Sequence, residues 1–128
     1  METVLPAGCG NAPRVFVVAD IVSAWARNDD AALAGLSAET ALWTVVGADP
    51  GAGSLAARIR PDEAVQRLEL DDIITHGRLA SCTGRLVIAG GDGELRCVEF
   101  SHHVRFRSAG RTAPLVAVRT FLAEGVSR

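Results

Sequence analysis

The sequence predicts an α+β domain in which helices pack on one face of a curved antiparallel sheet. Near the N-terminus, apolar residues recur at helical spacing from Val15 to Arg27. After Leu70, apolar residues alternate with polar ones, which is typical of strands with one buried face. Helices early in the chain and strands late favour an α+β fold over a parallel α/β fold.

Two helices are predicted first, after residues 1–12, which show no periodic pattern and are expected to form a flexible arm. Pro13 suits the first turn of a helix. The apolar side of this helix consists of Val15, Val18, Ala19, Val22, Trp25 and Ala26. Asn28 and Asp29 end it, and one of them can cap a second helix over residues 30–36.

A strand, a loop and a third helix are predicted next. Residues 41–46 are an apolar and β-branched run centred on Trp43, which favours a strand. Residues 47–60 are rich in glycine and are expected to form a long loop. A third helix is predicted to begin at 61–63, because proline suits the first turn and two acidic residues favour the positive end of the helix dipole. Its apolar stripe is Ala64, Val65 and Leu68.

Four further strands complete the predicted sheet. They cover residues 72–76, 79–88, 95–107 and 112–122. The turns between them are marked by Gly77, by the glycine-rich residues 90–93 and by residues 108–110. Short connections of this kind join neighbouring antiparallel strands.

Composition limits the classes of function. The 128 residues fit one domain, expected over residues 13–123. A formal net charge of −2, with both signs intermixed, argues against a nucleic-acid binder, which needs a dense basic surface. There is neither an apolar run of about 18 residues nor a secretory signal pattern, so we expect a cytoplasmic protein with no membrane partner. The odd number of cysteines favours free thiols.

Three groups of residues carry a resemblance to a known family. They are Trp43 to Gly47, His76-Gly77-Arg78 followed by Gly84, and the run from Phe100 to Phe106. These motifs resemble a bacterial branch of SnoaL-like proteins in the nuclear transport factor 2-like superfamily, which includes ketosteroid isomerases and polyketide cyclases. Over about residues 13–122, the resemblance implies a cone-shaped antiparallel sheet wrapped around three N-terminal helices, with a pocket inside. A shared fold does not settle function.

Strand alternation and this resemblance together predict which side chains line the pocket. On the strand over residues 95–107, the face with Phe100 and Val104 is apolar apart from His102, so it is expected to point inward. On the last strand, the resemblance favours the face with Arg119. The predicted lining is Ile21, Trp25, Trp43, Val45, Cys82, Leu86, Phe100, Val104, Phe106, Leu115 and Phe121. Apolar walls with few polar groups suit a hydrophobic small-molecule ligand.

The candidate catalytic residues are His102, His76 and Arg119. The resemblance places His102 where the isomerases carry an aspartic acid that stabilises an enolate; a histidine could act there as an acid, a base or an oxyanion donor. The alternative is a core histidine satisfied by a neighbour. His76 matches a histidine of dehydratase-like members or is a solvated turn residue. Arg119 either holds an anionic or carbonyl group of a ligand or pairs with a carboxylate at the mouth of the cone.

The chain departs from the family's catalytic pattern. The positions of the isomerase tyrosine and aspartate match Ile21 and Val45, and the chain contains no tyrosine. No metal site is predicted, because His102 and His103 are adjacent in a strand and point apart. No cofactor is predicted either, because the glycines at 51 and 53 lack the spacing of a nucleotide-binding loop.

Three functions stay open from the sequence. The first is a small-molecule-binding domain with an open apolar pocket that contains His102. The second is a cofactor-independent isomerase, cyclase or lyase acting on a polyketide- or steroid-like carbonyl compound through His102. The third is a non-catalytic module that forms a homodimer through its sheet. The third predicts a cone filled by Trp25 and Trp43, which are either core residues or ligand platforms.

Overall fold

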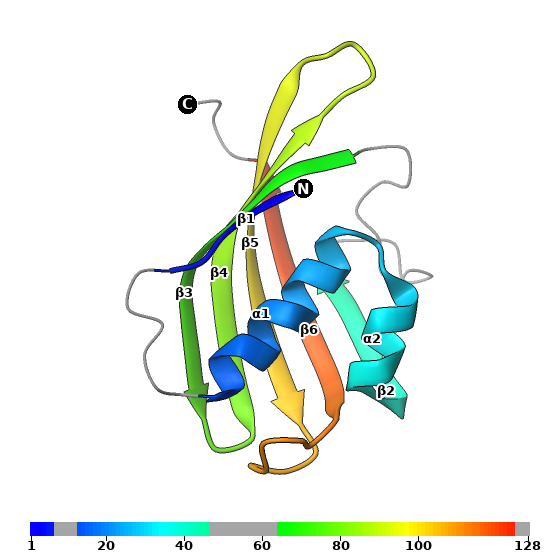
Figure 1. Ribbon diagram of the computed structural model, residues 1–128, viewed down its shortest axis with the longest axis vertical. Coiled ribbons are helices and arrows are strands. Elements are labelled where there is room, and N and C mark those ends of the chain that lie inside the picture. The colour runs from blue at the N-terminus through cyan, green and yellow to red at the C-terminus, as the bar shows by residue number, and fades with distance from the viewer. Residues whose placement is uncertain (7–12, 47–63, 125–128) are drawn as a thin grey trace.

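The computed structural model describes residues 1–6, 13–46 and 64–124. In chain order its elements are β1 (Glu2–Val4), α1 (Pro13–Ala26), α2 (Asp30–Leu36), β2 (Ser37–Val46), β3 (Ala64–His76), β4 (Leu79–Ala89), β5 (Leu95–Phe106) and β6 (Leu115–Glu124). These strands form one sheet in the order β1-β3-β4-β5-β6-β2, and both helices lie on the same face of it (Figure 1). The predicted α+β class is confirmed.

The sheet is mixed, not purely antiparallel as predicted. The pairs β3–β4, β4–β5 and β5–β6 are antiparallel. At the two edges, β1 runs parallel to β3 and β2 runs parallel to β6. Glu2–Val4 was expected in a loose arm, but it pairs with β3 from Arg67 to Glu69. Edge pairings of this kind join distant segments, so no local sequence pattern predicts them.

The prediction of a third helix is wrong over residues 64–70, which belong to β3. The pairing of β3 with β4 has two irregularities, between Val65 and Arg67 and between Leu70 and Asp72. Each inserts one extra residue into β3. Val65 and Leu68 therefore both face the core although they are three positions apart, which imitates helical spacing. Residues 61–63 and the loop predicted over 47–60 lie outside the described residues.

The first two helices have the bounds that their end signals predict. After α1, Asn28 adopts a positive φ of 56°, which asparagine tolerates better than most residues. The Asp29 side chain accepts a hydrogen bond of 3.1 Å from the Ala32 backbone N–H, so it caps α2. Neither helix is long and apolar enough to span a membrane.

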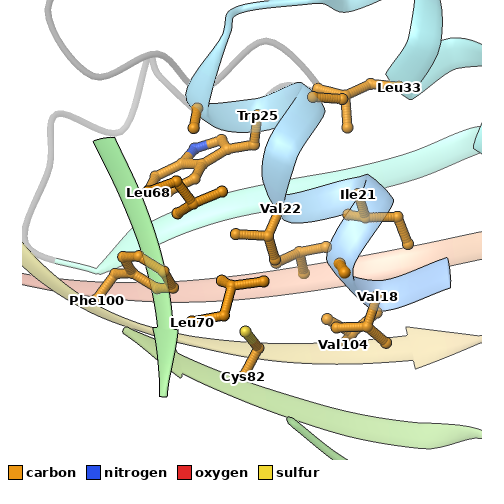
Figure 2. Close-up of a cluster of buried hydrophobic side chains, with 14 of the residues drawn as sticks. Val18, Ile21, Val22, Trp25, Leu33, Leu68, Leu70, Cys82, Phe100 and Val104 are labelled. Atoms are coloured by element: carbon orange, nitrogen blue, oxygen red, sulfur yellow. The ribbon is translucent and has the colours of Figure 1, made fainter. Parts of the chain in front are cut away.

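The core lies between α1 and the inner face of the sheet, which we define as the face that carries the helices. Val18, Ile21 and Val22 of α1 are fully buried and point toward side chains of the strands (Figure 2). From the sheet, Leu68, Leu86 and Ile88 are equally buried. The opposite face, here called the outer face, carries no described helix (Figure 1).

Gly84 of β4 lies close to the backbone of β3. A Cβ atom at this position would lie 2.0 Å from the Glu69 carbonyl oxygen and 2.9 Å from Phe100 Cζ. Because the Glu69 backbone is held in the sheet, we expect Gly84→Ala to lower the free energy of unfolding by about 1–3 kcal/mol. Urea denaturation measures this loss. Gly91→Ala is the control, because nothing lies within 4 Å of its new methyl group. Equal losses in both variants would contradict the prediction.

Candidate functional site

His102 faces inward, as predicted, but its surroundings are filled with aromatic side chains. The side chain is completely buried. The ring of Trp25 meets it edge-on at a centroid distance of 4.3 Å, and the rings of Phe100 and Trp43 lie at 4.7 and 5.6 Å. Trp25 also stacks on Trp43, with centroids 6.0 Å apart and planes 12° apart. This packing fits the alternative of a core histidine.

A short hydrogen-bond chain holds His102 in place. Trp43 Nε1 donates to Thr120 Oγ1 at 2.8 Å, and the same oxygen lies 2.6 Å from His102 Nδ1. Because the indole can only donate, the Thr120 hydroxyl proton remains free to be donated to Nδ1. His102 Nε2 has no hydrogen-bond partner among the described residues. Thr120 is thus a buried polar anchor that the sequence reasoning missed.

The same burial makes His102 a poor acid–base group near neutral pH. Desolvation, with a smaller contribution from the nearby charge of His103, lowers the pKa of His102 from its usual 6.5 to about 3. An efficient general base has a pKa near the working pH. The pKa of His102 is therefore far below the value that an acid–base catalyst needs near neutral pH, and its imidazole stays neutral there.

Cys82, the register neighbour of His102 on β4, is also chemically quiet. Burial, followed by the charges of Asp71 and Asp72, raises the pKa of the Cys82 thiol from 9.0 to about 12. Only the thiolate is a strong nucleophile. The side chain therefore acts as a small apolar core residue.

Arg119 and Phe121 point outward, which corrects the predicted direction of both. Leu115 is buried opposite Phe106, whereas Ala117 lies opposite Arg105, so one extra residue separates the two pairs. This irregularity inverts the alternation for the rest of β6. Thr120 faces inward instead, with no exposed surface. The cost of burying an unpaired guanidinium was a sequence signal in favour of this direction.

The rest of the predicted pocket lining forms the hydrophobic core. These residues are Ile21, Trp25, Trp43, Val45, Cys82, Leu86, Phe100, Val104, Phe106 and Leu115; Val45 is half-buried and the others are buried. Figure 2 shows several of them converging beneath α1. The inward direction predicted for these residues agrees with the structure. Their side chains pack against one another, however, and form a core where an open pocket was predicted.

A pocket of about 750 Å³ lies on the outer face of the sheet, and we call it the outer-face pocket. Strands β2, β3, β4, β5 and β6 all contribute to it. Its apolar wall includes Leu42, Ile74, Leu79 and Ala117. Its polar groups include His76, Ser81, His103, Arg105 and Arg119. The structure thus brings His76 and Arg119 together here, and it places His102 on the opposite face.

Two of these polar groups share one aromatic support. His103 and Arg119 lie opposite each other in the register of β5 and β6. The Phe121 ring meets the His103 ring edge-on at 5.7 Å, and the Arg119 guanidinium lies 5.5 Å from the centroid of the Phe121 ring. His103 Nε2 is also 3.3 Å from Ser101 Oγ. These contacts limit the positions that both side chains adopt at the pocket.

Within residues 1–6, 13–46 and 64–124, no cluster of three or more histidine, cysteine, aspartate or glutamate side chains has an arrangement that could hold a metal ion.

No family model and no curated protein matches the sequence. Solved structures do match. One is a nuclear transport factor 2-like protein of unknown function from Burkholderia pseudomallei, with a TM-score of 0.63 and 21% identity over 86% of this chain and 90% of that chain. Another, from Burkholderia thailandensis, has a TM-score of 0.60 and 19% identity over 89% and 92%. This chain has the nuclear transport factor 2-like fold.

A candidate isomerase from Rhodopseudomonas palustris shares this nuclear transport factor 2-like fold. It has a TM-score of 0.63 and 12% identity over 88% of this chain and 90% of that chain. Identities this low establish the arrangement of the elements alone, because one fold hosts many activities. The cone-shaped sheet implied by the sequence is confirmed at this level.

Proposed function

We propose that this protein is a small-molecule-binding domain and that the outer-face pocket is its binding site. The observation that carries the proposal is the composition of this pocket. Leu42 and Ile74 each expose 63% of their surface, and Leu79 exposes 49%. Exposed aliphatic side chains gathered in one hollow, beside a few polar groups, are typical of ligand sites. The volume of about 750 Å³ suits a small organic molecule.

The inner face gives less support to a binding or catalytic role. A ligand that reached His102 would have to displace Trp25, Trp43 or Phe100 from their mutual contacts. The low pKa of His102 adds a second obstacle to an isomerase- or cyclase-type reaction there. The proposal therefore moves the expected binding site from the inside of the cone to the outer face.

A homodimer that pairs outer faces is the second candidate, and charge favours it. The end of this face near the pocket carries Arg105 and Arg119. The other end carries Glu69, Asp71 and Glu99 around Arg85, with N–O distances of 2.7, 2.8 and 3.8 Å. A two-fold axis across the strands would place the basic end of one copy over the acidic end of the other. Such a dimer would also cover the exposed apolar residues.

Ile74→Glu tests both candidates, because it introduces a carboxylate into the apolar wall of the pocket. We expect ligands found by a thermal-shift screen of small apolar compounds to bind this variant at least about tenfold more weakly, since a charge opposes burial of an apolar body. Leu95→Glu is the matched control, because Leu95 is 57% exposed and does not line the pocket. Equal affinity for both variants would overturn the proposed site.

The mass of the protein in solution separates the two candidates. Multi-angle light scattering measures this mass. If the protein is a monomer and binds ligands, the result supports the pocket proposal. A dimer that Ile74→Glu dissociates and Leu95→Glu leaves intact supports pairing of outer faces. A dimer that survives Ile74→Glu contradicts that pairing.

A further inference from the structure

The ionisable groups of the outer-face pocket are all basic. Among the described residues, its lining contains the guanidinium groups of Arg105 and Arg119 and the imidazoles of His76 and His103, with no aspartate or glutamate. The nearest glutamate on the same face of β5 is Glu99, six residues before Arg105, or about 20 Å along the strand. Asp72 is exposed on the same face of β3, two residues before Ile74, but among the described residues no carboxylate lines the pocket beside the two guanidinium groups of β5 and β6.

The carboxylates at the far end of the outer face do not reach these guanidinium groups. Glu69 and Asp71 accept hydrogen bonds of 2.7 and 2.8 Å from Arg85, and Glu69 also pairs with Arg67 at 3.1 Å. In the part of the chain that the structure describes, neither Arg105 nor Arg119 forms an ion pair with a carboxylate. Both guanidinium groups keep their donors available for an external anion.

Apolar side chains of the pocket lie on both sides of its two arginines, with Leu42 on β2 and Ala117 on β6 at one side and a larger aliphatic surface at the other. Ile74 and Leu79 lie on the adjacent strands β3 and β4, whereas Arg105 and Arg119 lie on β5 and β6. A ligand that spans these strands meets an aliphatic surface at one end and guanidinium groups at the other. The guanidinium fork matches the two oxygens of a carboxylate.

We propose that the outer-face pocket binds an amphipathic carboxylate, with its anionic head at Arg105 and Arg119 and its apolar body over Ile74 and Leu79. This inference rests on the proposed function, since it names the chemical class of ligand for the same site. Arg119 is the better-oriented of the two anchors, because its guanidinium lies against the Phe121 ring and its register partner is His103.

Two probes with the same apolar body test the inference: 4-phenylbutyrate and 4-phenylbutan-1-ol. Each is titrated into ¹⁵N-labelled protein, and the backbone amide shifts of β5 and β6 report the affinity and the location. We expect the carboxylate to bind at least about tenfold more tightly than the alcohol, because a charge-assisted hydrogen bond is worth more than a neutral one. In Arg119→Gln this preference should fall to about twofold or less, with binding of the alcohol unchanged.

The control variant is Arg67→Gln, which removes the same charge from the same face. Arg67 pairs with Val87 in the register of β3 and β4, six residues along β4 from Ser81 of the pocket. It should keep the preference for the carboxylate. Equal loss in both variants would show a general charge effect and overturn the assignment to Arg119. Equal binding of both probes to the wild type would overturn the carboxylate class and leave the proposed function standing, whereas shifts from neither probe would count against the pocket itself.

Discussion

Replacing Trp43 with alanine is expected to lower the free energy of unfolding by about 3–5 kcal/mol. The side chain is fully buried, it stacks on Trp25, and its Nε1 donates to Thr120 Oγ1. The substitution would leave a large cavity between the helices and the sheet. It would also deprive the buried Thr120 hydroxyl of its donor. Urea denaturation of the wild type and of Trp43→Ala measures this difference in unfolding free energy.

Trp43→Phe is the informative companion variant. It keeps an aromatic ring beside Trp25 and His102 but removes the indole N–H, so we expect a smaller loss of about 1–3 kcal/mol. The two losses separate the packing of the ring from the hydrogen bond to Thr120. A loss below about 1 kcal/mol for Trp43→Ala would show that the indole borders open space. That result would return the binding site to the inside of the cone.

Local sequence signals predicted the parts of the fold that local interactions determine. The second helix covers Asp30–Leu36, as predicted, because the cap at Asp29 is a contact within one turn. The inward face of β5 is also as predicted, since the buried residues Phe100, His102 and Val104 alternate with less buried residues without interruption. Gly77 makes the predicted turn, with a φ of 58°.

Irregular pairing between distant strands limited the rest of the prediction. In β3, two extra residues changed the spacing of inward side chains, and this spacing imitated a helix. In β6, one extra residue before Ala117 inverted the faces, so Arg119 and Phe121 were predicted inward and point outward. Such irregularities depend on the partner strand, and strict alternation along one strand does not reveal them.

The outer-face pocket was out of reach of the sequence for a related reason. Its apolar residues Leu42, Ile74 and Leu79 come from three different strands, and each one alone is an ordinary exposed side chain. Only the order of strands in the sheet brings them beside Arg105 and Arg119. The family resemblance implied a pocket on the opposite, inner face.

The stability of the protein is expected to depend on pH through His102. Its pKa is about 3 in the folded protein and near 6.5 when the chain is unfolded, so the unfolded state binds more protons between these values. The contribution of His102 to the free energy of unfolding is fully present above about pH 6.5. As the pH falls below that value, this contribution is lost by roughly 1.4 kcal/mol per pH unit. At pH 4.5 the loss reaches roughly 3 kcal/mol. Carboxylates also titrate in this range, so the wild type has to be compared with variants.

His102→Gln removes this titration while keeping a polar side chain next to Thr120. Its unfolding free energy should therefore fall less steeply than that of the wild type between about pH 6.5 and pH 4.5. The difference between the two slopes should correspond to about one proton taken up on unfolding. His76→Gln is the control, because it changes an exposed histidine at the end of β3 and leaves both His102 and its neighbour His103 in place. Urea titrations at several pH values give the slopes. Equal slopes for the wild type and His102→Gln would mean that His102 takes up its proton in the folded state, which requires water beside the ring. Trp25 and Trp43 pack against the His102 ring and leave no room for such a water. Equal slopes would therefore contradict this packing of the interior.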